Sequence, residues 1–152
     1  MLLNKNKLEC VKNLQETIEI HPKHMTPRLG HEMKSILTNQ MKKKCDREHG
    51  YMHKIDTINH FKCDKIASNC YGIYNVTYDA SFIKPVVGET YSCTFLFDFD
   101  EGFFVNVDGF FKIMVIHNNK KMKMRESVMS IKILKMQFTN SEFQCIGEYI
   151  EK

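Results

Sequence analysis

The hydrophobic pattern is clearest between residues 74 and 82, where apolar and polar side chains alternate. The apolar members of this run are Tyr74, Val76, Tyr78, Ala80 and Phe82. An alternation with a period of two predicts a β-strand that buries one face and leaves the other in water. The run therefore indicates a sheet with one solvent-facing side.

A helix is predicted before this strand, because apolar residues recur there three and four positions apart. These residues are Leu29, Met33, Ile36, Leu37 and Met41. Thr26 is a favourable N-cap and Pro27 a favourable first helical residue, so the helix is expected over about 27–44. Its last turn holds three consecutive lysines, where positive charge interacts favourably with the helix dipole.

Weaker signals complete the first half of the chain. Residues 15–20 and 50–59 are predicted strands, residues 1–14 a polar lead-in that frays, and 60–71 an exposed loop without a regular period. A strand, a helix and two further strands describe a compact α+β domain, which we expect over about residues 1–85.

After Pro85 the pattern changes to almost pure β structure. The first strand is predicted to place five residues on one face: Tyr91, Cys93, Phe95, Phe97 and Phe99. Asp108-Gly109 is a strong signal for a two-residue hairpin turn. The strands are expected at about 90–99, 103–107, 110–116, 128–138 and 142–149. Five strands with a longer gap after the third fit an all-β, five-stranded OB-fold barrel, expected over about residues 86–152.

The composition is that of an ordinary globular protein. The 152 residues, 43% hydrophobic and 26% charged, suit one large domain or two small ones. No apolar run approaches the roughly 20 residues that span a bilayer, and polar residues follow Met1 too soon for a secretory signal. The six cysteines form no Cys-x-x-Cys pair and are expected to be reduced thiols. We therefore expect a soluble intracellular protein.

The formal net charge of +4 conceals two oppositely charged segments. Residues 79–111 contain six acidic residues and one lysine, whereas residues 112–135 contain seven basic residues and one glutamate. The basic segment is a candidate phosphate-contacting surface. From charge alone, a solvated lysine-rich loop explains it about equally well.

The order of these elements, with short motifs at their junctions, resembles one protein family. The motifs are His21-Pro22, Pro27, Leu29, Cys45, Gly50-Tyr51, Val76, Tyr78, Ala80, Phe82, Pro85, Gly88, Glu89, Gly102-Phe103 and Ile146-Gly147. In order and spacing they resemble the stalk subunit of DNA-directed RNA polymerases. This is the seventh subunit of RNA polymerase II, which shares its plan with the corresponding stalk subunit of the archaeal polymerase. Two features differ: the segment after His117 is shorter than in cellular members, and residues 60–63 replace their Gly-rich tip loop.

The resemblance implies a non-catalytic subunit that acts in transcription. It implies a tip domain (residues 1–85) that docks on the large core subunits of the polymerase. It also implies an OB barrel of the S-one type (residues 86–152) that contacts nascent single-stranded RNA. A small helical stalk partner of the fourth-subunit type, or a substitute, is expected as well. No association with a membrane is expected. The location is expected to be nuclear for a cellular eukaryotic member. The Asn-, Lys-, Ile- and Met-rich composition hints at a large DNA virus. For a viral member the expected location is the cytoplasm, in a virus factory or virion.

Two groups of residues follow as candidate contacts. The predicted polymerase-core contacts come from the irregular loop: Ile58, Asn59, His60, Phe61, Lys62 and Ile66. The predicted RNA contacts are Phe104, Phe111, Lys112, Lys120, Lys121, Lys123 and Arg125. Aromatic faces stack bases and lysines meet phosphates in such barrels. The alternative for each phenylalanine is a place in the barrel core, and the alternation requires that some of them lie there.

Other chemistry is weakly signalled. The candidate metal ligands are Cys45, His49, His53, His60 and Cys63. Their spacing lacks the paired ligands of a structural zinc site, so no metal is expected. With no nucleotide-binding loop and no nucleophile elbow, we expect neither an enzyme nor a cofactor. Two alternatives to the polymerase II stalk stay open. One is a free-standing OB-fold protein that binds single-stranded RNA in translation or decay, and the other is the stalk subunit of RNA polymerase I or III.

Overall fold

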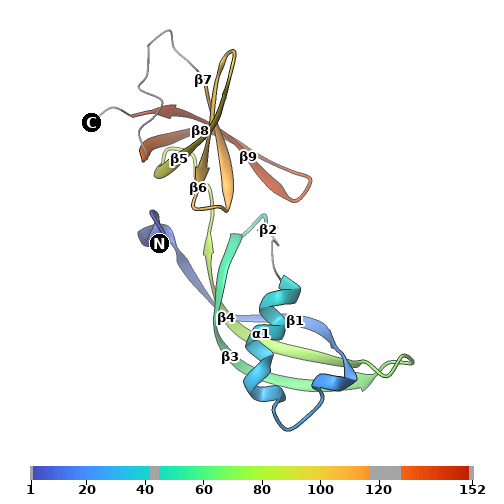
Figure 1. The fold of residues 1–152 in the computed structure, drawn as a ribbon. Coiled ribbons are helices and arrows are strands. Elements are labelled where there is room, and N and C mark those ends of the chain that lie inside the picture. Colours follow the sequence, from blue (N-terminus) through green and yellow to red (C-terminus); the bar gives the residue numbers. More distant parts are fainter. Residues whose placement is uncertain (1, 42–44, 117–127, 151–152) are drawn as a thin grey trace. The chain divides into compact units, whose positions relative to one another are not determined.

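The computed structural model describes residues 2–41, 45–116 and 128–150, and Figure 1 shows how their elements are connected. The helical elements are two short 3-10 turns, Lys5–Lys7 and Pro22–His24, and the α-helix α1 (Leu29–Met41). The strands are β1 (Glu9–Ile20), β2 (Cys45–Asp46), β3 (Gly50–Ile66), β4 (Gly72–Ile83), β5 (Thr90–Phe99), β6 (Gly102–Val107), β7 (Phe111–Ile116), β8 (Met129–Thr139) and β9 (Glu142–Tyr149).

These elements form two compact units, and neither unit is a continuous stretch of chain. The barrel unit comprises Met1–Leu8, Cys45–Tyr51 and Ile83–Lys152, and the helix unit comprises Glu9–Lys44 and Met52–Phe82. The expected single boundary near residue 85 would place residues 1–8 and 45–51 in the helix unit. In the structure both segments belong to the barrel unit.

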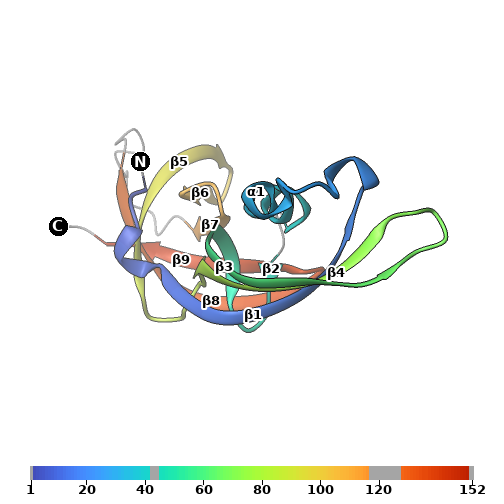
Figure 2. The same cartoon turned by 90° about the horizontal axis from the view of Figure 1, so that it is seen from below.

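In the helix unit, α1 lies against one face of the sheet that β1, β4 and β3 form (Figures 1 and 2). Its buried side chains are Leu29, Met33, Leu37 and Met41, four of the five residues that the helical spacing marked. The Thr26 hydroxyl accepts a hydrogen bond from the Arg28 backbone N–H at 3.2 Å, next to the start of the helix. The predicted helix and the predicted strand at residues 74–82 are both confirmed, and residues 42–44 of the helix prediction lie outside the described residues.

The prediction of a frayed lead-in over residues 1–14 is wrong. Strand β1 begins at Glu9 and pairs antiparallel with β4. Its register shifts between Val11 and Leu14, where Asn13 has a positive φ of 57°. The Asp79 carboxylate accepts hydrogen bonds from the Asn13 backbone N–H at 2.9 Å and from the Asn59 amide at 2.8 Å. These bonds to the carboxylate lower the pKa of Asp79 and hold the bulge in place.

The prediction of an exposed loop over residues 60–71 is wrong for residues 60–66, which belong to a strand. Strand β3 continues to Ile66, and only residues 67–71 connect it to β4. The core-facing residues Ile55, Ile58 and Phe61 fall three positions apart, so β3 does not keep the period of two that would have revealed it. The long β3–β4 hairpin is clear in Figure 2.

The barrel unit is built on a closed five-stranded barrel with the strand order β5-β6-β7-β9-β8. All neighbours in it are antiparallel except β7 and β9, which are parallel. The buried core contains Tyr91, Phe103, Val105, Phe111 and Ile113 among others. The architecture is compatible with a β-rich, OB-like domain, and the five predicted strands are confirmed to within two residues at each end.

Two glycines let the strands of this barrel approach closely. A Cβ atom on Gly102 would collide with the backbone carbonyl oxygen of Val115 on the neighbouring strand. A Cβ atom on Gly147 would lie 2.7 Å from the carbonyl oxygen of Lys132. A side chain at either position would force neighbouring backbone apart, which explains why the Gly102-Phe103 and Ile146-Gly147 motifs suit a barrel.

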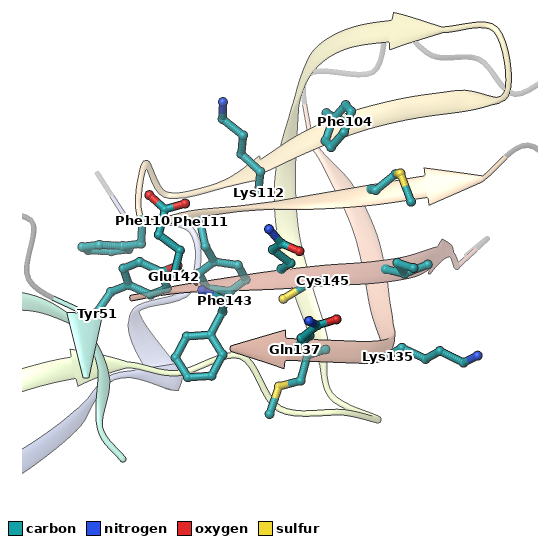
Figure 3. Close-up of a pocket in the computed structure, with 14 residues that line it drawn as sticks. Tyr51, Phe104, Phe110, Phe111, Lys112, Lys135, Gln137, Glu142, Phe143 and Cys145 are labelled. Carbon is teal, nitrogen blue, oxygen red and sulfur yellow. Dashed lines mark hydrogen bonds between the residues drawn. The ribbon is translucent and has the colours of Figure 1, made fainter. Parts of the chain in front are cut away.

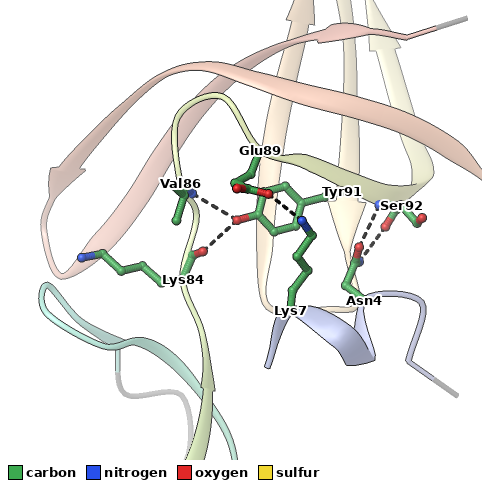
Figure 4. A network of polar contacts seen from close by, with 7 residues as sticks. All are labelled: Asn4, Lys7, Lys84, Val86, Glu89, Tyr91 and Ser92. Carbon is green, nitrogen blue, oxygen red and sulfur yellow. Dashed lines mark hydrogen bonds and ion pairs between the residues drawn. The ribbon is translucent and has the colours of Figure 1, made fainter. Parts of the chain in front are cut away.

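The connector between β4 and β5 is fixed to the barrel by Tyr91 (Figure 4). The Tyr91 hydroxyl donates a hydrogen bond to the Lys84 carbonyl oxygen at 2.8 Å and accepts one from the Val86 N–H at 3.1 Å. Burial raises the pKa of Tyr91 to about 12, so the hydroxyl stays protonated and keeps its donor role.

The first residues of the chain bind the same side of the barrel. Asn4 and Ser92 exchange two hydrogen bonds of 2.8 Å, from the Asn4 amide nitrogen to the Ser92 carbonyl and from the Ser92 N–H to the Asn4 side-chain oxygen. The Lys7 ammonium lies 2.6 Å from the Glu89 carboxylate, and 5.6 Å from the centre of the Tyr91 ring. Figure 4 shows these contacts side by side. Residues 2–8 are therefore a structural part of the barrel unit.

Candidate nucleic-acid interface

A β-bulge in β5 changes which residues of this strand face outward. Phe95 pairs with the buried Val105, but the register shifts at Leu96, and Phe97 then pairs with Phe104. The prediction that Tyr91 to Phe99 share one face is therefore wrong beyond Phe95. One extra residue moves Phe97 and Phe99 to the outer face of the barrel, where Phe104 lies.

The three outward phenylalanines form an aromatic cluster across β5 and β6. The ring centre of Phe104 lies 5.0 Å from that of Phe97 and 5.3 Å from that of Phe99, with interplanar angles of 37° and 42°. Phe97 keeps 49% of its surface exposed. We call Phe97, Phe99 and Phe104 the aromatic cluster.

The pairing register extends this cluster into a row across all five strands of the barrel. Phe97 pairs with Phe104, Phe104 with Met114, Met114 with Ile146, and Ile146 with Lys135. We call these five residues the outer row. Four steps of about 4.8 Å give the row a length of about 19 Å along the barrel surface. An apolar surface thus runs from the aromatic cluster to a lysine.

Most of the outer row borders an open pocket with a volume of about 700 Å³ (Figure 3). Its lining residues are Tyr51, Phe104, Phe110, Phe111, Lys112, Met114, Lys135, Met136, Gln137, Glu142, Phe143, Gln144, Cys145 and Ile146. Pockets of this size, with a mostly apolar lining and a few polar groups, are typical of ligand sites in proteins.

The predicted RNA contacts divide into three groups. Phe104 and Lys112 line the pocket, and Lys112 is exposed. Phe111 also borders the pocket, but its side chain is only 4% exposed and belongs to the barrel core. The prediction of Phe111 as a stacking face is therefore corrected, because its ring is covered by protein. The remaining contacts, Lys120, Lys121, Lys123 and Arg125, lie outside the described residues.

Tyr51, at the start of β3, covers the Phe111 ring. The two rings are stacked with centres 5.6 Å apart and an interplanar angle of 18°. The Tyr51 hydroxyl accepts a hydrogen bond from the Phe143 N–H at 2.9 Å. Burial raises the pKa of Tyr51 to about 12, so its hydroxyl group stays protonated and uncharged at neutral pH.

The charged groups of the pocket are spread along its border. Figure 3 shows the amines of Lys112 and Lys135 pointing away from the barrel core, with the Glu142 carboxylate near Tyr51 and Phe110. The two lysines have flexible stems and can meet phosphate oxygens, while the neighbouring apolar side chains offer flat surfaces to bases. The arrangement suits a ligand that is both anionic and aromatic.

The sequence did not mark Phe97, Phe99, Gln137 or Gln144 as site residues, and it marked Lys135 only as a member of the basic segment over residues 112–135. Gln137 donates a hydrogen bond from its amide to the Thr139 hydroxyl at 2.8 Å, which fixes its orientation. The only available signal was the basic character of residues 112–135, since a bulge leaves no mark in the alternation of a strand. The cross-strand register is what brings these residues together.

The predicted polymerase contacts lie on β3 instead of a loop. Phe61 packs on the core of the helix unit, with its ring centre 6.3 Å from that of Tyr74. The Asn59 amide bonds the Asp79 carboxylate, so this side chain is engaged within the chain. His60, Lys62 and Ile66 are exposed, and Ile66 keeps 55% of its surface accessible.

Metal ligation and membrane spanning find no support in the described part of the chain. No group of three or more His, Cys, Asp or Glu side chains there is placed to hold a metal ion. Among the same residues, no helix is long and apolar enough to cross a membrane. Comparison of the sequence with protein-family models and with curated proteins finds no match.

Proposed function

We propose that this protein is the non-catalytic stalk subunit of a multisubunit DNA-directed RNA polymerase and that its barrel binds single-stranded RNA. The observation that carries the RNA-binding role is the pocket along the outer row, which combines Phe104 and Met114 with Lys112 and Lys135. Single-stranded nucleic acid is held in OB-like barrels by aromatic side chains under the bases and by lysines at the phosphates.

The stalk role rests on the order of motifs in the sequence together with the division into two units. A helix-covered sheet and a five-stranded barrel are what the resemblance led us to expect. In this proposal the helix unit is the tip domain and the barrel is of the S-one type. A small helical protein of the fourth-subunit type, or a substitute, is the expected partner of both.

The polymerase contact is proposed for the exposed end of the β3–β4 hairpin. Lys62 and Ile66 are exposed near this end, and residues 67–71 form the turn. The Cys70 N–H bonds the Ala67 carbonyl at 2.9 Å, and the Tyr71 N–H bonds the Asn69 side chain at 3.1 Å. A turn that is internally bonded and carried on a long hairpin can present a defined surface to a large partner.

The RNA-binding role is tested with the purified chain and an unstructured, dye-labelled 12-nucleotide RNA. We expect the Lys112→Gln/Lys135→Gln variant to bind more weakly and to lower the slope of log K against log salt by about 1.4, because each phosphate contact on a single strand contributes about 0.7. The matched control is Lys54→Gln/Lys65→Gln, which changes two exposed lysines of the helix unit. An unchanged slope in the pocket variant would refute the proposed phosphate contacts.

The stalk role is tested by purifying the tagged chain at mild salt from its native or infected cells and identifying the proteins that accompany it. Stoichiometric recovery of the two largest polymerase subunits is the expected result, and their identity shows which polymerase is served. Ile66→Asp is expected to lose these subunits while RNA binding by the purified chain stays unchanged. Recovery of RNA or ribosomal proteins without polymerase subunits would leave only the free-standing RNA-binding protein.

A further inference from the structure

We propose that Phe97 and Phe99 form an additional base-stacking subsite on β5 for an unstacked nucleobase of single-stranded RNA. The inference rests on the proposed RNA-binding role of the barrel and names a part of the site outside the pocket. Neither residue lines the pocket, which reaches only to Phe104 at this end of the outer row.

The first argument is the position of the rings. A phenylalanine in a strand with regular alternation would follow Phe95 into the core, where its apolar surface is removed from water. The bulge at Leu96 instead places Phe97 on the outer face with about half of its surface exposed. Phe104 contacts Phe97 and Phe99 with tilted rings, which fixes their orientation and leaves the half-exposed Phe97 ring accessible to a further aromatic group.

The second argument is continuity with the pocket. The outer row joins Phe97 to Phe104 and Met114 without a polar residue between them. An RNA strand that lies in the pocket with its phosphates near Lys112 and Lys135 therefore meets the aromatic cluster as it leaves the pocket. The length of the row, about 19 Å, matches a site of about four nucleotides, the lower limit for a barrel of this kind.

The third argument is charge. The turn after Phe99 carries Asp100 and Glu101, both exposed, and no lysine lies between Leu96 and Phe111. Acidic side chains repel phosphate, so this end of the row is unsuited to holding the RNA backbone. The charges at the two ends of the outer row therefore agree with one arrangement. In it, a base lies on the aromatic cluster and the phosphates lie at Lys112 and Lys135.

The test compares Phe97→Leu with Phe97→Tyr in the full chain. Leucine keeps an apolar side chain without a flat ring, whereas tyrosine keeps the ring. Each variant is titrated with the labelled 12-nucleotide RNA and with the same RNA made abasic at six alternate positions, which preserves the phosphates. The control is Val87→Ala, an apolar residue of the barrel unit with 52% of its surface exposed that lies outside the row.

We expect Phe97→Leu to bind intact RNA about fivefold more weakly and Phe97→Leu/Phe99→Leu at least tenfold more weakly, as for the loss of base stacking. Phe97→Tyr and Val87→Ala are expected to bind like the wild type. Phe97→Leu is expected to bind the abasic RNA as well as the wild type does, with an unchanged salt slope, because stacking releases no counterions.

Two results would overturn the inference. Equal weakening of Phe97→Leu on intact and abasic RNA would show that the residue does not act through a base. Unchanged RNA affinity, combined with loss of a small accompanying protein in the purification described above, would assign the cluster to a protein partner. Failure of the wild type to bind RNA would refute both the RNA-binding role of the barrel and the stacking subsite. Recovery of the polymerase subunits with the tagged Phe97→Leu variant would show that the stalk role does not depend on the subsite.

Discussion

Asn4 and Asp108 are separated by 104 positions in the sequence, and two hydrogen bonds join them in the barrel unit. One carboxylate oxygen of Asp108 accepts from the backbone N–H and from the side-chain amide of Asn4, each at 2.9 Å. The other accepts from the Leu3 N–H at 2.8 Å. Asp108 is the first residue of the hairpin turn between β6 and β7 and has a positive φ of 51°. A turn residue of the barrel thus anchors the beginning of the chain.

We expect Asn4→Ala to lower the free energy of unfolding by about 1–3 kcal/mol, because the Ser92 N–H and carbonyl lose their partner in a partly buried position. Asn4 is only 3% exposed and is the one buried polar residue among the described residues. Asn6→Ala, an exposed asparagine of the same segment, is the control and should change stability little. Urea unfolding of both variants measures the difference, and equal midpoints would contradict the anchoring role.

The discontinuous barrel unit leads to a prediction about truncation. A fragment of residues 86–152 lacks Ile83 of the core and also Leu8 and Tyr51, which pack against it. We expect this fragment to unfold without a cooperative transition, or with a midpoint far below that of the full chain, because each missing side chain leaves apolar surface exposed. Near-UV circular dichroism and urea unfolding measure the outcome. A fragment as stable as the full chain would show that the N-terminal segments are dispensable.

Alkaline pH should weaken the fold through its buried tyrosines. Burial raises the pKa of Tyr51 and Tyr91 from 10.0 to about 12. A group with a raised pKa in the folded state contributes stability that is complete below its unfolded pKa and is lost as pH rises to its folded pKa. We therefore expect stability to be constant, as far as these two groups are concerned, up to about pH 10 and to fall between pH 10 and about 12.

The measurement is the urea midpoint from pH 8 to 12 for the wild type and for Tyr51→Phe/Tyr91→Phe. The buried Cys93 and Cys145 also have a pKa raised to about 12, so they add a loss in the same direction to both proteins. The tyrosine contribution is the difference between the two curves, which should be smaller at pH 12 than at pH 9. Parallel curves would contradict it.

The sequence predicts those elements whose faces differ in polarity. Strand β4 and helix α1 each bury one side, so the periods of 2 and 3.6 were readable and the predicted ranges agree with the structure. Strand β3 was missed in its second half because Ile55, Ile58 and Phe61 are spaced by three. The strand predicted over residues 15–20 was shorter than β1, because lysine and asparagine side chains near Asn13 obscure the pattern there. The bulge at this point is held by Asp79, a carboxylate that is distant in the sequence.

The candidate site was predictable only in outline. Alternation required that one member of each pair, Phe103-Phe104 and Phe110-Phe111, face the core, but it did not say which one. The structure places Phe103 and Phe111 inside. The aromatic cluster depends on one extra residue, Leu96, that changes the face of everything after it in β5. Register and bulges are properties of strand pairs, so a single strand's pattern does not contain them.

The acidic turn beside the aromatic cluster gives the last prediction. Asp100 and Glu101 are exposed and follow directly after Phe99, so they lie within the range of about 10 Å over which charges act at 0.1 M salt. If RNA ends its path at the cluster, removing these charges reduces repulsion of the nearest phosphates. We expect Asp100→Asn/Glu101→Gln to bind the 12-nucleotide RNA about two- to threefold more tightly than the wild type does at 0.1 M salt, and as tightly as the wild type at 1 M salt.

The matched control is Glu9→Gln/Glu19→Gln, which removes two exposed acidic residues of the helix unit and the same net charge. Equal gains in both variants would indicate a general effect of net charge, and no gain in either would place the RNA away from this turn.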